Sequence, residues 1–131
     1  MSSVARRALV AGAVLGLLGV AAGAFGTHGL RGTVSVRDLE IWQTGAHYQQ
    51  LHAVLLVIIG VSTRAPSRAL AVAAALLTVG VLVFSGTLYA MVLGGPRILG
   101  AVTPLGGLCL MTGWASLGAH AMYARAQPDD A

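Results

Sequence analysis

The stretch that decides the fold is ALVAGAVLGLLGVAAGAFGTHGL, residues 8–30, which contains no Asp, Glu, Lys or Arg. Three further stretches without such residues follow at 41–63, 69–96 and 98–124. Each of these stretches is longer than the ~20 apolar residues that an α-helix needs to cross a bilayer. The sequence therefore predicts an all-α integral membrane protein, in which four transmembrane helices form a bundle.

The composition supports a membrane protein and excludes several other classes. The chain has 131 residues, of which 56% are hydrophobic and only 9% charged, whereas soluble domains carry about 25% charged residues. A single cysteine, Cys109, excludes a disulfide scaffold. The net charge is +4, but the basic residues are all arginines that flank the apolar stretches. Because there is no basic stripe with interleaved aromatic residues, we expect the lipid bilayer, and no nucleic acid, as a partner.

The arginines also predict an orientation in the membrane. Four spans place both termini on one side, and the arginines on that side are Arg6, Arg7, Arg64, Arg68 and Arg125. The other side has Arg31, Arg37 and Arg97. The positive-inside rule thus predicts a multi-pass protein of the plasma (inner) membrane with both termini cytoplasmic. A signal peptide cleaved at 22–24 is the alternative, but the apolar run continues past this point, so we expect an uncleaved first helix.

The predicted architecture is a single membrane domain over 1–131. We expect transmembrane helices at about 8–27, 47–63, 69–93 and 104–124, with an amphipathic interfacial helix at about 36–46 before the second of them. Ser35 and Asp38 have the spacing of a capping box at the start of the interfacial helix.

The last helix has two possible starts. Pro104 inside a helix would leave a carbonyl unpaired and kink the chain. We prefer the alternative, in which Thr103 is the N-cap and Pro104 the first helical residue.

The first helix contains two GxxxG pairs, formed by Gly12 with Gly16 and by Gly19 with Gly23. Helices in lipid associate through close backbone packing, which small residues permit. We therefore expect this helix to be an interior helix that packs on another helix of the same chain. Packing against a second copy of the chain is the alternative.

Four motifs occur in order along the chain, and they are Gly23–Leu30, Tyr48–Ala53, Phe84–Tyr89 and Thr103–Gly107. Together they resemble a small membrane family, domain of unknown function 423, whose relatives include transmembrane protein 256. Thr27 stands where the family more often has Ala. The resemblance implies a four-helix integral membrane protein and supplies no activity.

Polar side chains inside the apolar stretches are the candidate functional residues, because such groups at membrane depth usually face a partner, a cavity or a pathway. Topology alone gathers six of them in the non-cytoplasmic leaflet, where we expect a polar pocket formed by His28, Tyr48, His52, Ser85, Tyr89 and Thr103. The alternative is structural, since these residues can also satisfy one another's hydrogen bonds.

The chemistry available to this pocket is narrow. His28 and His52 are the pair suited to a metal ion or a haem. Two histidines alone are too few for a typical zinc site, since catalytic zinc sites usually have three protein ligands. The sequence requires no cofactor and has no nucleophile–base–acid set, so an enzyme is not favoured. We expect an accessory, interaction or lipid-binding subunit, with a homo-oligomer or a membrane protein as possible partner. The alternatives are a small transporter or ion-conducting protein that acts as an oligomer, and a haem- or metal-binding membrane protein.

Overall fold

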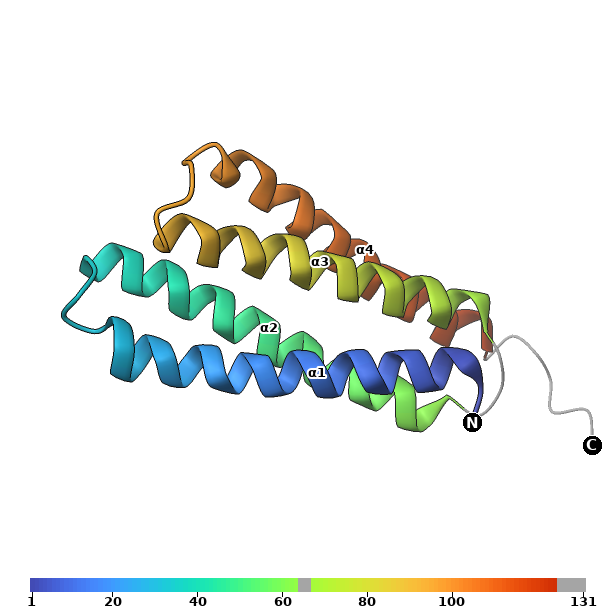
Figure 1. Cartoon of the computed structure of the whole chain (residues 1–131). Helices are drawn as coiled ribbons and strands as arrows, with labels where there is room; N and C mark the ends of the chain where they lie inside the picture. The colour runs from blue at the N-terminus through green and yellow to red at the C-terminus, as the bar shows by residue number, and fades with distance from the viewer. Residues whose placement is uncertain (64–66, 125–131) are drawn as a thin grey trace, which may run out of the picture.

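The computed structural model of the chain describes residues 1–63 and 67–124, and within them it is built from helices alone. The elements are α1 (Ser3–Phe25), the π-helical segment η1 (Gly26–Leu30), α2 (Val36–Ser62), α3 (Arg68–Val92) and α4 (Leu99–Ala124) (Figure 1). This confirms the all-α fold predicted from the sequence.

The helices run up and down, so that each is antiparallel to the next (Figure 1). We call the end where α1 and α3 begin the N-terminal end, and the end where α2 and α4 begin the opposite end. α1 packs mainly on α2, α2 on α3, and α3 on α4, while α1 meets α3 over a much shorter stretch and does not contact α4. The expectation that the first helix is the interior one is therefore wrong: α2 and α3 lie between the others. The glycines of α1 lie on one face of the helix, so α1 can pack closely on only one other helix, which is α2.

That glycine face lies against α2. A Cβ atom on Gly12 would lie 2.8 Å from the Ala53 carbonyl oxygen, and one on Gly19 would lie 2.9 Å from Cγ of Gln50. Gly23 also faces Gln50, whereas Gly16 has more room, since its Cβ would be 3.7 Å from the nearest atom. The close approach thus occurs within one chain, as preferred above.

The connection from α1 to α2 differs from the prediction in two ways. α1 ends at Phe25, and the chain continues as the wider turn η1 before it turns toward α2. The segment 36–46 does not form a separate interfacial helix, because it is the first part of the continuous helix α2. Its start is as predicted: the Ser35 hydroxyl accepts a hydrogen bond from the Asp38 amide at 3.0 Å. No residue after this cap ends the helix, so the polar first turns and the apolar rest form one rod.

The start of α4 contradicts the preferred prediction. The helix begins at Leu99, so Pro104 lies inside it and Thr103 is no N-cap. The entry is made by short-range bonds such as that from the Leu99 amide to the Pro96 carbonyl at 3.1 Å. Thr103 instead faces α3, where its hydroxyl lies 2.7 Å from that of Thr87. Thr103 thus contacts a neighbouring helix, and a capping rule, which uses only residues close in sequence, does not predict such a contact.

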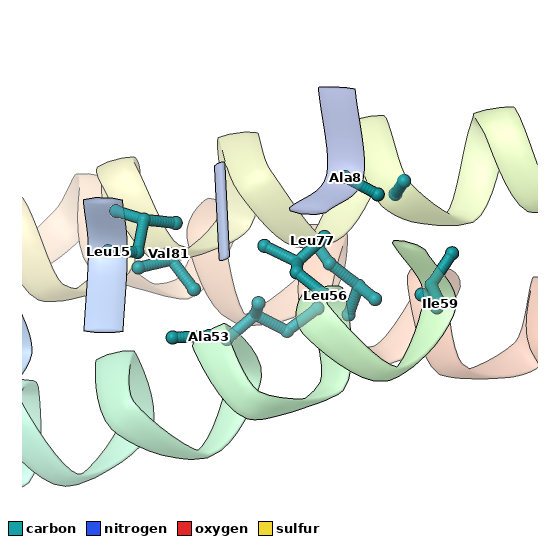
Figure 2. Close-up of a cluster of buried hydrophobic side chains, with 9 residues drawn as sticks. Ala8, Leu15, Ala53, Leu56, Ile59, Leu77 and Val81 are labelled. Atoms are coloured by element: carbon teal, nitrogen blue, oxygen red, sulfur yellow. The ribbon is translucent and has the colours of Figure 1, made fainter. Parts of the chain in front are cut away.

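The core is built from small and branched apolar side chains contributed by all four helices (Figure 2). Its buried residues are Ala8, Leu15, Ala53, Leu56, Ile59, Ala74, Leu77, Val81 and Leu110. Glycine brings α3 and α4 together as well, because a Cβ on Gly80 would lie 2.6 Å from Cδ2 of Leu110. The bundle is thus held by backbone-close packing along its seams, as helix pairs in lipid usually are.

Two of the described helical segments are long and apolar enough to cross a membrane, namely Ser3–Leu30 and Arg68–Val92. The sequence predicted four such segments. α2 and α4 are as long as the other two, but α2 carries several Gln and His residues, and α4 carries glycines, threonines and a proline. These residues lower the mean hydropathy of both helices.

Candidate functional site

The polar side chains of α2 hold α1 through its backbone. Three of them donate hydrogen bonds to α1 carbonyl oxygens: Trp42 Nε1 to Ala22 at 2.7 Å, Gln49 Nε2 to Leu15 at 2.9 Å, and Gln50 Nε2 to Gly19 at 2.7 Å. A donor reaches a helix carbonyl only when the helices are close, and the small residues of α1 allow this approach. The glycine face and the amide side chains are therefore parts of one interface.

Gln49 also connects α2 to α3, and so links three helices. Its side chain is only 5% exposed, and its Oε1 accepts a hydrogen bond from the Tyr89 hydroxyl at 2.8 Å. One turn earlier on α3, the Ser85 hydroxyl donates to the Gly45 carbonyl at 2.8 Å. Trp42 packs on Tyr89 with ring centroids 4.4 Å apart. These contacts form a polar network that we call the Gln49 network: Trp42, Gln49, Gln50, Ser85 and Tyr89.

His52 makes a second polar contact in the middle of the bundle, and it is 2% exposed. The indole N–H of Trp114 on α4 donates to His52 Nε2 at 3.2 Å. Because Nε2 accepts, the neutral ring carries its proton on Nδ1, which donates to the Tyr48 carbonyl at 2.7 Å. Both ring nitrogens are therefore in use, and His52 could bind a metal ion or haem only after losing its bond to Trp114.

The remaining predicted pocket residues lie elsewhere. Tyr48 is on the surface, where its ring packs against Phe84 with centroids 4.6 Å apart. Thr103 is buried in the seam between α3 and α4. His28 is exposed on η1. The structure thus brings Ser85 and Tyr89 together around Gln49, but it does not place the six residues around a single pocket.

Two important residues were missed at the sequence level, Gln49 and Trp114. Gln49 lies in one of the four family motifs, Tyr48–Ala53, but it is not among the six residues of the predicted pocket. The available signal was an amide side chain in a charge-free stretch, which has to find partners at membrane depth. Trp114 carried a weaker signal: its side chain is 47% exposed, but its indole N–H is a donor within a charge-free stretch and finds its acceptor on His52.

The network is closed. In the described part of the chain, every buried side-chain nitrogen and oxygen atom has a hydrogen-bond partner. Over residues 1–63 and 67–124, no three His, Cys, Asp or Glu side chains come together as a metal site would require. The buried polar side chains of the described residues are therefore paired with neighbouring side chains or with backbone carbonyls, which agrees with the structural alternative stated above.

Open space lies along the furrow between α1 and α3. Near the N-terminal end a hollow of about 290 Å³ is lined mainly by alanines, with Arg7 and Thr78. Further along the same two helices a second hollow of about 270 Å³ lies between Leu18 and Leu82 and is floored by Gln49. Small-molecule pockets start at about 300 Å³, so the two hollows in line could hold a slender apolar ligand.

Comparison with known proteins places this fold in a family. Residues 22–107 match the family described as "Protein of unknown function (DUF423)". The UPF0382 membrane protein SH2409 of Staphylococcus haemolyticus is 42% identical over 109 residues, which cover 83% of this chain and 89% of that protein. The UPF0382 membrane protein YwdK of Bacillus subtilis is 38% identical over 108 residues, covering 81% and 88%. No solved structure gives a significant match.

The helical fold and these relatives define a small all-α membrane protein. The chain belongs to the DUF423 family. The resemblance drawn from the four sequence motifs is thereby confirmed, and all four motifs lie inside the matched region.

Proposed function

We propose that the chain spans the cell membrane four times, with both termini in the cytoplasm, and acts as an accessory or lipid-binding subunit. One observation carries the functional part of this proposal: the polar groups of the interior are used up in holding the helices together, while the open furrow faces outward between α1 and α3. Such a molecule offers its surface to other molecules.

The exposed surfaces of α2 and α4 support four spans. The buried polar side chains of α2, Gln49 and His52, are turned into the bundle. The large side chains that these two helices expose are mostly apolar, among them Leu51, Val54, Ile58, Leu105, Leu108 and Met111. The mean hydropathy of α2 and α4 is therefore low although the outer face of each helix is apolar, as a face in contact with lipid would be. α2 has 27 residues, which at 1.5 Å per residue extend about 40 Å and exceed the ~30 Å hydrocarbon core.

The charges at the two ends support the orientation. Arg6, Arg7 and Arg68 lie at the N-terminal end, while Arg31, Arg37 and Arg97 lie at the opposite end. Arg64 and Arg125, which the prediction also assigned to the side of the termini, lie outside the described residues. The described arginines are therefore three at each end, and the excess of five to three that favours the cytoplasm for the N-terminal end comes from Arg64 and Arg125 in the sequence.

The same contacts argue against the alternatives. A conduction pathway needs polar groups arranged across both leaflets with positions open to an ion or substrate. The Gln49 network instead lies in one half of the bundle, and its polar groups are bonded to one another or to backbone carbonyls. A haem or metal site on His52 would compete with Trp114 for Nε2.

Cysteine labelling of the full chain tests the spans and the orientation. In a Cys109→Ala background, single cysteines replace Ser3, Val36 or Leu93, and intact cells are treated with a membrane-impermeant maleimide. Four spans predict labelling at 36 and 93 from outside, and at 3 only after permeabilisation. If α1 and α3 alone crossed the membrane, position 93 would be cytoplasmic, and its protection in intact cells would contradict the proposal. Labelling of position 3 in intact cells would reverse the orientation.

Native mass spectrometry tests the functional part. The chain is extracted in mild detergent, and we expect it to retain a lipid or a co-purifying membrane protein. A chain that is bare in every mild detergent would contradict a binding role.

A further inference from the structure

The hollow at the N-terminal end exists because α1 and α3 do not pack closely on each other. Both helices rest on α2, and they face each other across alanines, including Ala8 and Ala11 on α1 and Ala71, Ala74 and Ala75 on α3. Methyl groups are too short to close the space of about 290 Å³ between the two backbones. An empty space of this kind forfeits dispersion contacts along its whole lining. In a bilayer, the acyl chains of lipids are available to fill this space.

A positive charge stands at the outer end of this hollow. Arg7 lines it and is an exposed residue, as is its neighbour Arg6, which does not line it. Within the described residues the carboxylates are those of Asp38 and Glu40, at the opposite end of the bundle. A phosphate beside Arg7 would therefore meet complementary charge, with no competing acid nearby among the described residues. Arginine suits this role because its planar fork of N–H donors matches phosphate oxygens.

The length of the furrow matches one leaflet. From Arg7 to Leu18, the far wall of the second hollow on α1, the helix rises about 16 Å at 1.5 Å per residue. Half of the hydrocarbon core is about 15 Å. A chain that enters beside Arg7 would thus end near the middle of the bilayer. The polar groups that floor the second hollow, Gln49, Ser85 and Tyr89, already have partners, so a methylene chain can lie over them.

We propose that the α1–α3 furrow binds one acyl chain of an anionic phospholipid, and that Arg7 binds the phosphate of its headgroup. This inference rests on the proposed function, because it needs the N-terminal end to lie at a membrane surface. It goes further in naming the ligand class, the groove and the residue that selects it.

Native mass spectrometry of the intact chain with added lipid tests the inference. The probes are dioleoylphosphatidylglycerol and dioleoylphosphatidylcholine, which have the same acyl chains and differ in headgroup charge. We expect one bound phosphatidylglycerol, at several times the occupancy of phosphatidylcholine. Glycerol 3-phosphate, which has the phosphate without the acyl chains, should not compete. Competition by this probe at similar concentration would point to a free-anion site and overturn the inference.

Two matched pairs of variants separate the furrow from general charge. Arg7→Gln should lower phosphatidylglycerol binding about tenfold, while Arg6→Gln removes the same charge outside the hollow and should lower it no more than about threefold. Ala75→Phe fills the furrow and should lower binding of both lipids, while Ala115→Phe, on the exposed face of α4, should not. Arg7 and Ala75 line the hollow, whereas Arg6 and Ala115 do not, and Ala71→Leu, also in the lining, replaces Ala75→Phe if the latter fails to fold.

Several outcomes would overturn the inference. Equal losses for the two arginine variants would mean diffuse attraction to the membrane surface. Unchanged lipid binding in the furrow-filling variant would place the lipid elsewhere, and a dimer that the same variant dissociates would make a second copy of the chain the occupant. A protein partner retained without any bound lipid would also refute the lipid inference, yet it would leave the proposed accessory role standing.

Discussion

The two halves of the bundle are held together in different ways. In the half nearer the N-terminal end, the helices meet mainly through apolar packing, with Ala8, Leu56 and Leu77 at the centre (Figure 2). The polar contact there is that of Ser67 Oγ with His120 Nδ1 at 3.3 Å. In the half nearer the opposite end, Gln49 and Tyr89 join α1, α2 and α3 by hydrogen bonds. His52 lies near the boundary between the halves, and its bond with Trp114 joins α2 to α4.

This difference has a physical reason. Lipid tails are as apolar as the side chains, so apolar packing in a membrane gains little unless backbones come very close. A hydrogen bond between helices adds direction to this packing and fixes the rotation of one helix against the next. In a bilayer such bonds contribute about 0.6 kcal/mol on average and 1–2 kcal/mol in model peptides. We therefore expect shape to give most of the stability and the Gln49 network to give the register.

The largest effect should come from overfilling the glycine face. A Cβ on Gly12 would lie 2.8 Å from the Ala53 carbonyl oxygen and 2.8 Å from the Val57 amide nitrogen, and backbone atoms cannot move aside. Gly12→Ala should therefore force α1 away from α2 and lower the free energy of unfolding by about 1–3 kcal/mol. Thermal unfolding in detergent measures this change.

The matched control is Gly16→Ala, four residues along the same helix. Its Cβ would lie 3.7 Å from the nearest atom, which is ordinary contact. Alanine is the better helix former by about 1 kcal/mol, so this variant should be neutral or slightly stabilising. Equal destabilisation by the two variants would show that the seam between α1 and α2 is not as close as described.

The next effect tests the hydrogen-bonded half. Gln49→Leu removes the bond to the Leu15 carbonyl and leaves the Tyr89 hydroxyl without its acceptor. We expect a loss of about 1–2 kcal/mol in unfolding free energy, since a buried polar group then stays unpaired. Gln43→Leu serves as control, because this side chain is on the exposed face of the same helix. A Gln49 variant as stable as the control would refute the role given to the network.

Much of this arrangement was predictable from the sequence, and the failures have a common cause. Charge-free stretches and a serine cap are local signals, so the helical class and the start of α2 at Ser35 were predicted correctly. The sequence also predicted that polar motifs from separate helices gather toward one end. The partners of each polar group were not predictable, because they depend on the rotation of each helix about its axis. His28 is exposed and His52 is buried for this reason, although both looked equivalent in the sequence.

Pro104 and Gln49 are two examples of contacts between helices that the local sequence does not predict. The proline rule assigns a helix start from two neighbouring residues, but the contact of Thr103 with Thr87 comes from another helix. Gln49 lacks charge and is flanked by polar residues, so no local pattern separates it from Gln50. Its position against both Leu15 and Tyr89 appears only when three helices are assembled. Local rules thus fail where a contact between helices decides.

The smallest effect concerns the boundary between the halves. Trp114→Phe removes the indole N–H that donates to His52 Nε2 at 3.2 Å, while it keeps an aromatic ring against His52. The bond is long and stands alone, so we expect a loss of about 0.6 kcal/mol. A double-mutant cycle with His52→Leu isolates this bond from the loss of ring area. A coupling energy near zero would show that this bond does not hold α4 to α2, and the contact of Thr103 with Thr87 would then be what joins α4 to the hydrogen-bonded half.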